Sequence, residues 1–320
     1  METMPFDPAR TARNPVPPPL GPPPAPARAA HPGVGRNYAR TAMLMGGLVA
    51  LLAIGGSLVG GAQGMLAFGA IGLAFNFLAY WFSDKLALMG NGARPVTREQ
   101  LPEVYEIVER LTRKAGLPMP RIYVIPSEAP NAFATGRNPE HAAVAVTEGI
   151  LRTLDKRQLE GVLAHELAHV QNRDILIATV AGAMAGLISS VGYLMRWGAI
   201  LGGGRSDRDG PSALELLAWA IVAPLVALVI QLAISRSREF GADATGAALV
   251  GDPEPLAQAL LALEAGNDAS PMASAGPATA HLFIVNPLRG TGAKLMSLFS
   301  THPPVEERVA RLRALRGQLR

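Results

Sequence analysis

The sequence predicts a mostly α-helical membrane protein with a small β-sheet, in which two transmembrane helical hairpins alternate with the parts of a soluble domain. Composition is the first reason: 49% of the 320 residues are hydrophobic, only 17% are charged, and the mean hydropathy is +0.23. The second reason is the pattern, because apolar stretches long enough to span a bilayer are separated by amphipathic helices and short strands.

Charge and cysteine content narrow the possible partners. The net charge is +4 and the isoelectric point is about 9.7, but the sequence has no dense run of lysine or arginine and no nucleic-acid motif. We therefore expect no nucleic-acid partner, and we attribute the basic excess to residues that flank membrane segments. Cysteine is absent, so disulfides and thiolate metal ligands are excluded and a bound metal must be held by imidazole and carboxylate groups.

Residues 1–36 are rich in proline and poor in apolar side chains, which predicts a disordered segment with polyproline II character. We expect this segment to be a spacer; the alternative is a proline-rich ligand for a partner protein. No short apolar core followed by a small-residue cleavage site opens the chain, so a secretory signal peptide is not expected.

Residues 37–83 predict the first transmembrane hairpin. Thr41–Gly60 and Met65–Phe82 contain no charged residue, and a helix rising about 1.5 Å per residue crosses a hydrocarbon core of roughly 30 Å over such a length. The predicted turn is Gly61–Gly64. Basic residues precede and follow the pair while the turn is uncharged, so the positive-inside rule places both ends in the cytoplasm.

A soluble domain is predicted to begin with residues 84–174. Its expected elements are an amphipathic helix at Arg98–Gly116, strands at Arg121–Pro126 and His141–Thr147, a short third strand at Asn131–Thr135, and a helix capped by Asp155 and Gln158. Residues 175–234 then predict a second hairpin. Its connecting loop is charged, so a shallow or partly buried hairpin is the alternative.

Residues 235–320 are predicted to complete the soluble domain. We expect helices around Glu239–Asp243, over Pro255–Gly266 and over Pro304–Arg316, with a loop at 267–280. If one metal is held by ligands on both sides of the second hairpin, an even number of membrane crossings must separate those ligands. Two spans satisfy this condition.

The helix after Asp155 contains the motif HELAH, an HExxH sequence. His165 and His169 lie one turn apart on one helical face, where both can bind one metal ion, and Glu166 lies beside them as a general base. This pattern is typical of zinc metalloproteases. The alternative is a pair of core histidines with satisfied ring nitrogens.

A catalytic zinc needs a third protein ligand, and Glu239 is the best candidate. Asp243 follows it by one helical turn and could accept the second ring N–H of a ligating histidine. The alternative for Glu239 is a helix-surface acid paired with Arg236 or Arg238. His302 and Arg308 are candidates for stabilising a tetrahedral oxyanion; from the residues alone, a capping histidine and a solvated arginine explain them slightly better.

Four motifs together resemble those of the HtpX-type membrane zinc metalloproteases, which are relatives of the CAAX prenyl protease. They are HELAHVQNRD (165–174), SREFGAD (237–243), PNAFATGRNP (130–139) and THPPVEER (301–308). The resemblance covers residues 37 to 320; the proline-rich segment is longer than the family pattern. It implies a gluzincin-like domain, one Zn²⁺ per chain bound by His165, His169 and Glu239, and Glu166 as the base.

The same resemblance implies a multi-pass protein of the bacterial cell inner membrane, with the N-terminus and the protease domain in the cytoplasm. Its expected substrates are misfolded or damaged membrane proteins, in protein quality control. It makes His302 and Arg308 contacts of the substrate or oxyanion, and it places the substrate strand beside Asn131, Ala132, Phe133 and Ala134. A peptide added to an exposed edge there would be bound mainly by main-chain hydrogen bonds.

Two other functions stay open at this point. One is a membrane scaffold or chaperone-like binder with a structural zinc, which predicts four protein ligands. The other is a prenyl-protein protease. No oligomeric state is predicted.

Overall fold

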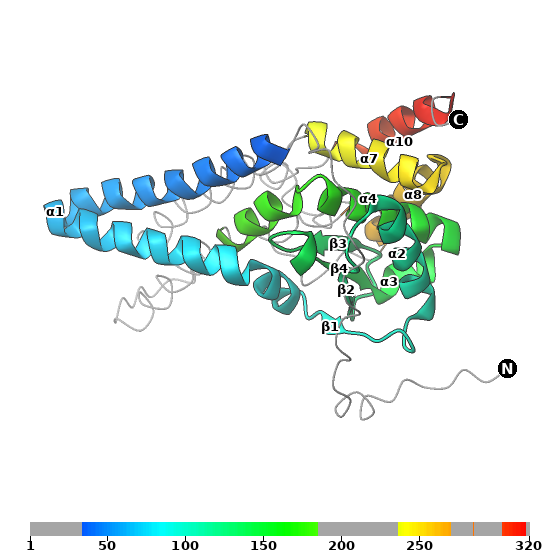
Figure 1. The fold of residues 1–320 in the computed structure, drawn as a ribbon, viewed down its shortest axis with the longest axis horizontal. Helices are drawn as coiled ribbons and strands as arrows, with labels where there is room; N and C mark the ends of the chain where they lie inside the picture. The colour runs from blue at the N-terminus through cyan, green and yellow to red at the C-terminus, as the bar shows by residue number, and fades with distance from the viewer. Residues whose placement is uncertain (1–33, 185–235, 270–283, 285–302, 318–320) are drawn as a thin grey trace, which may run out of the picture.

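The computed structural model describes residues 34–184, 236–269, 284 and 303–317, and Figure 1 shows their arrangement. Several predictions fall outside these ranges: nearly all of the proline-rich segment, most of the second hairpin, most of the loop at 267–280, and His302. Within the described ranges the chain is mostly helical and contains one small mixed sheet, as predicted.

Helix α1, Val34–Gly90, consists of two antiparallel arms that extend away from the other elements (Figure 1). The helical backbone is interrupted only at Gly60 and Gly61, and the φ of +58° at Gly61 is one that glycine adopts without strain. The predicted turn Gly61–Gly64 is therefore too long. The second arm continues beyond residue 83, where the predicted hairpin ends, as far as Gly90, and the Asp84 carboxylate forms an ion pair with Arg121 of the soluble domain (2.8 Å).

The two arms of α1 contact each other from the reversal as far as Met45 and Asn76. Near the reversal, a Cβ atom on Gly56 or on Gly64 would overlap the carbonyl oxygen of the other residue, so only glycine permits this approach. Farther from the reversal, the Asn76 side-chain amide donates a hydrogen bond to the Met45 carbonyl across the pair (2.8 Å). The arms are thus held together by backbone contact and by a buried amide.

The outer surface of α1 is apolar. Asn37–Ile54 and Gly60–Gly90 are two helices long and apolar enough to cross a membrane by length and composition. Among the described residues, every exposed large hydrophobic side chain except Met119 and Leu261 belongs to α1. An apolar surface of this extent is what a lipid-facing helix presents.

The sheet has the strand order β1-β2-β4-β3. Its strands are β1 (Arg94–Pro95), β2 (Arg121–Ile125), β3 (Ala132–Thr135) and β4 (Ala143–Thr147). The central strands β2 and β4 are parallel, and each outer strand is antiparallel to its neighbour. The three predicted strands are confirmed, although β4 begins two residues late because η2, Pro139–His141, forms a 3-10 turn before it.

The part of the chain that forms the sheet also forms three helices. They are α2 (Pro102–Ala115), α3 (Glu148–Thr153) and α4 (Lys156–Gln171). Helix α2 begins later than predicted because Pro102 favours the first helical turn, and Gly116 ends it as expected. The predicted cap of α4 is confirmed: Asp155 and Gln158 form a reciprocal capping box. Helix α3 was not predicted, and the Thr147 side chain caps it.

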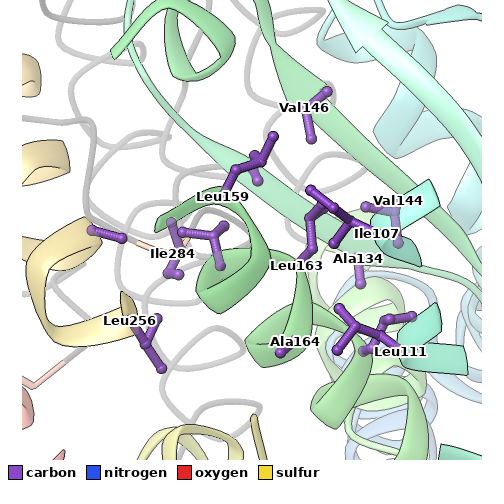
Figure 2. Packing of buried hydrophobic residues seen from close by; sticks show 14 of the residues in the cluster. Ile107, Leu111, Ala134, Val144, Val146, Leu159, Leu163, Ala164, Leu256 and Ile284 are labelled. Carbon is purple, nitrogen blue, oxygen red and sulfur yellow. The ribbon is translucent and has the colours of Figure 1, made fainter. Parts of the chain in front are cut away.

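The C-terminal part supplies α7 (Arg236–Val250), α8 (Glu254–Ala269), α10 (Val305–Ala314) and the 3-10 turn η5 (Leu315–Gly317). Helix α8 runs three residues into the predicted loop at 267–280, because Asn267 is buried and tertiary packing continues the helix. Figure 2 shows the core around α4, where Leu163 lies between strand side chains such as Val144 and the residues Leu256 and Ile284. Helix α4 is therefore enclosed on several sides.

Candidate metal centre

Helix α4 presents His165 and His169 on one face, one turn apart. Their Nε2 atoms are 3.2 Å from each other, and their rings are nearly perpendicular, with centroids 4.7 Å apart. A carboxylate oxygen of Glu239 lies 3.8 Å from His165 Nε2, and the other lies 3.6 Å from His169 Nε2. Three groups that can bind a metal therefore converge, with ligand atoms all within 4.8 Å of one another.

Helix α7 places Glu239 beside the two histidines because it crosses α4 closely. A Cβ atom on Gly246 would lie 2.9 Å from the backbone nitrogen of His165, so a larger residue would push the two helices apart. Glu239, Asp243 and Gly246 recur at helical spacing on the buried face of α7. The alternative of a surface acid is wrong for Glu239, which is only 6% exposed.

The Nδ1 atom of His165 faces the core side of the centre. Asp243 Oδ1 lies 2.9 Å from it, and Arg308 binds both oxygens of that carboxylate, with Nε donating to Oδ2 (2.9 Å) and Nη2 to Oδ1 (2.7 Å). Burial lowers the pKa of His165 to about 4, so its imidazole is neutral at pH 7. For Asp243, burial raises the pKa but Arg308 and His165 outweigh it and hold the pKa at about 2.

The Nδ1 atom of His169 faces Asp174, whose Oδ2 lies 3.3 Å away. Burial opposes protonation of His169, but the hydrogen bond to Asp174 and the charge of Glu239 raise its pKa to about 9 in the metal-free protein. Sequence reasoning missed Asp174. The available signal was its place at the end of HELAHVQNRD, but helical periodicity could not find it, because the turn at Arg173 (φ +61°) brings it back to His169.

These residues fit a zinc ion. Two imidazoles and one carboxylate are a common ligand set of catalytic zinc, which keeps a further position for water. A ligating histidine normally donates its other ring N–H to a carboxylate, and both histidines here have a carboxylate at Nδ1 and their Nε2 atoms directed to the shared space. The donor set therefore supports metal binding through Nε2 of His165 and His169 and through Glu239.

Glu166 is held by the neighbouring strand. The backbone N–H of Ala134 in β3 donates to Glu166 Oε2 at 2.7 Å, and the glutamate is 3% exposed. Burial raises the pKa of Glu166 to about 8, with the negative charge of Glu239 acting in the same direction. The positive charge of a metal ion held by the neighbouring ligands would act in the opposite direction and favour the carboxylate form that a general base requires.

Strand β3 is the edge of the sheet, but this edge is not exposed as the sequence analysis expected. All four of its residues are buried, and Asn131 before it is also buried. The Ala132 carbonyl accepts a hydrogen bond from the Ile284 N–H (3.3 Å), and the Ala134 N–H is used by Glu166. A residue distant in sequence and the helix α4 thus cover an edge that strand alternation alone would leave open.

Arg308 is fully buried, so the alternative of a solvated helix arginine is wrong. Besides Asp243, its guanidinium donates to the Ile284 carbonyl through Nη1 (2.8 Å), and Nη2 lies 3.4 Å from both ring nitrogens of His165. Within the described residues, Arg308 therefore mainly holds Asp243, the carboxylate that faces Nδ1 of His165.

Comparison with known proteins identifies the family of the chain. The profile of Peptidase family M48 matches residues 98–316, which is more than half of the chain. The chain therefore belongs to Peptidase family M48, a family of metalloproteases.

Individual relatives of the chain are proteases of the HtpX type. A Protease HtpX homolog of Desulforapulum autotrophicum is 55% identical over 87% of this chain and 89% of its own length. Another, of Pyrococcus furiosus, is 49% identical over 87% of this chain and 96% of its length. The predicted resemblance to HtpX-type proteases is thus confirmed. The crystal structure of S. mikatae Ste24p aligns with a TM-score of 0.48 and 19% identity, covering 87% of this chain and 64% of that one.

Proposed function

We propose that the protein is an integral-membrane, zinc-dependent endopeptidase with one Zn²⁺ per chain. The observation that carries the proposal is the convergence of His165, His169 and Glu239, with the carboxylate of Glu166 fixed beside them. Three ligands leave a coordination position for water, as a catalytic site requires. A structural site would need a fourth protein ligand, and the described residues bring three such groups together.

Each residue has a defined task in peptide hydrolysis. A zinc ion bound here would lower the pKa of a coordinated water to about 7 and polarise the peptide carbonyl. The Ala134 N–H holds Oε2 of Glu166, which leaves Oε1 to take a proton from the attacking water. As the water oxygen bonds to the carbonyl carbon and the carbon–nitrogen bond breaks, Glu166 passes that proton to the leaving amine nitrogen.

The substrate-side contacts are part of the proposal. An extended peptide would lie along the Asn131–Ala134 segment, after displacing the backbone contact that Ile284 makes with Ala132. Arg308 would add positive charge near a developing oxyanion, since its Nη2 lies beside His165, and His302 would supply a further donor. Main-chain pairing gives little sequence selectivity, which suits unfolded substrates.

The proposed membrane placement is supported by α1. Both ends of α1 contact the soluble domain, through Asn37 near the start and Asp84 near the end, while the bend between its two arms lies far from the other elements (Figure 1). With the basic flanks, this arrangement favours a protease domain at the cytoplasmic face of a bacterial inner membrane. We also propose that residues 84–174 and 235–320 form one domain interrupted by a second hairpin at 175–234. Misfolded or damaged membrane proteins would then be the nearest substrates.

The test is the Glu166→Gln variant of the full-length protein in detergent. It should bind one zinc per chain and cleave casein at least about 100-fold more slowly than the wild type, because it keeps the ligands and loses the base. Glu160→Gln is the matched control: Glu160 is another buried glutamate of α4, but its carboxylate is paired with Arg110 (2.9 Å) and not directed at the ligands. This control should keep both zinc and activity.

Several results would contradict the proposal. Undiminished casein cleavage by Glu166→Gln would show that Glu166 is not the general base. Absence of zinc from the wild type, or four protein ligands around it, would favour a non-catalytic scaffold. Cleavage of a prenylated peptide without any cleavage of casein would instead favour a prenyl-protein protease.

A further inference from the structure

Asp174 connects the metal site to the start of the membrane hairpin. Its Oδ2 faces His169 Nδ1, and its Oδ1 accepts a hydrogen bond from the Asn37 side-chain amide (2.6 Å). Arg238 of α7 lies 4.0 Å from the same Oδ1 atom. One carboxylate therefore touches a metal-ligand candidate, the first arm of α1 and the helix that carries Glu239.

Asn37 is built into this contact. It is 6% exposed, and its Nδ2 also lies 3.3 Å from the Asn172 carbonyl, so one amide group contacts two residues of the turn that follows α4. Its backbone carbonyl accepts a hydrogen bond from Thr41 Oγ1 (2.9 Å) within α1. Burying an amide is costly unless it is hydrogen-bonded, so these contacts fix the side chain toward Asp174.

We propose that Asn37 is a positioning residue of the metal site, acting on His169 through Asp174. This inference rests on the proposed function, because it assumes that His169 binds zinc. The terminal torsion of an aspartate side chain is soft, so a carboxylate held at one oxygen only can rotate away from its partner. The Asn37 amide holds Oδ1 and thereby directs Oδ2 at Nδ1, which fixes the ring with Nε2 toward the ligand cluster.

Arg238 does not replace this function. At 4.0 Å its guanidinium supplies positive charge to Asp174, but a hydrogen bond, which fixes direction, requires a shorter distance. The core-side carboxylate Asp243 is different, since Arg308 holds both of its oxygens. Asn37 in α1 thus holds one oxygen of the Asp174 carboxylate. Arg308 holds both oxygens of the Asp243 carboxylate in the core.

The consequence is that the first membrane helix contributes to metal affinity without contacting the metal. Outer partners of this kind change metal affinity or activity by about 10- to 100-fold when they are removed. Because Asn37 acts through one intermediate residue, we expect the lower end of that range.

The experiment measures zinc affinity of the full-length protein in detergent micelles by competition with a chromophoric chelator. Asn37→Ala should weaken zinc binding about 10-fold. The matched control is Asn76→Ala, which also removes a buried asparagine amide of α1, hydrogen-bonded to the Met45 carbonyl instead of to the metal site. This control should bind zinc like the wild type. Asn37→Leu, which keeps the side-chain volume, provides the test if Asn37→Ala does not fold.

A double-mutant cycle separates positioning from a general structural effect. In a protein that already carries Asp174→Ala, adding Asn37→Ala should cause no further loss of zinc affinity, since the intermediate is gone. Substituting Co²⁺ for zinc adds a spectroscopic readout: the visible absorption bands should shift in Asn37→Ala and stay unchanged in Asn76→Ala.

The outcomes are distinct. If the wild type binds no zinc, the proposed function fails and this inference fails with it. If the wild type and Asn76→Ala bind zinc and Asn37→Ala binds it equally well, only the positioning role is wrong. Additive losses in Asn37→Ala and Asp174→Ala would also overturn it.

Discussion

The two histidines of the metal centre are supported by different parts of the molecule. His165 faces Asp243 and Arg308, and the side chains of all three are at most 4% exposed, so its support is a buried ion-pair network of the soluble domain. His169 is 16% exposed at its side chain, lies 3.3 Å from Asp174, and depends on a contact with the membrane hairpin at Asn37. The half of the site around His165 is therefore buried, and the half around His169 is more open.

This difference indicates that the candidate metal site is supported both by the soluble domain and by helix α1. The core half can form as soon as α4, α7 and α10 pack together. The second half is complete only when α1 is docked against the turn after α4. We therefore expect substitutions on the core side to affect both folding and metal binding, and those on the hairpin side to affect mainly metal binding.

The largest effect is expected for Arg308→Met. It leaves the Asp243 carboxylate buried without its bidentate partner, and breaking a buried pair from one side typically costs about 3–5 kcal/mol. Thermal unfolding in detergent should show a large fall in the midpoint. The control is Arg311→Met on the same helix, whose exposed pair with Glu307 should contribute less than about 1 kcal/mol. Equal effects of the two variants would contradict the account of the core half.

A smaller effect is expected when each carboxylate partner is neutralised. Asp243→Asn and Asp174→Asn should each weaken zinc binding within a range of about 10- to 100-fold, because the ligating imidazoles lose their acceptors. Asp243→Asn should be the more severe of the two, since its contact with Nδ1 is shorter, at 2.9 Å against 3.3 Å. Chelator competition measures the zinc affinity of both variants. A larger loss of affinity in Asp174→Asn than in Asp243→Asn would contradict this prediction.

The smallest effect concerns the pH dependence of the metal-free protein. His169 has its pKa raised to about 9 from an ordinary 6.5, so its protonation stabilises the fold below pH 6.5, and this stabilisation is lost as the pH rises from 6.5 to 9. His165 has its pKa lowered to about 4, so stability falls as the pH drops from 6.5 to 4.

Unfolding midpoints measured between pH 6.5 and 9 on chelator-treated protein test this contrast. The wild type should lose stability more steeply over this window than His169→Gln, which lacks the titrating group. His165→Gln is the control and should follow the wild type there. A wild-type slope no steeper than that of His169→Gln would mean that the two histidines do not differ in protonation.

Helical periodicity carried most of what the sequence revealed about the fold and the candidate site. The capping box at Asp155 indicated the start of α4, and the spacing of Glu239 and Asp243 indicated that both lie on one face of α7, which the structure shows to be buried. Such relations repeat every turn and need no knowledge of tertiary contacts.

The features that the sequence did not reveal depend on long-range contacts or on special backbone angles. Asp174 reaches His169 through a turn with a positive φ at Arg173, and Asn37 reaches Asp174 across 137 positions of the chain. The edge strand β3 is covered by Ile284, which a pattern of alternating residues cannot indicate. Neither composition nor periodicity contains these pairings.

The most direct test of the central claim is the coordination shell of zinc in the full-length protein. X-ray absorption at the zinc edge, combined with zinc counts for His165→Ala, His169→Ala and Glu239→Ala, determines it. We predict one zinc per chain, held by two imidazole nitrogens, one carboxylate and a water, with strongly reduced zinc in each variant. A shell of four protein ligands, or full zinc content in the Glu239→Ala variant, would contradict the account.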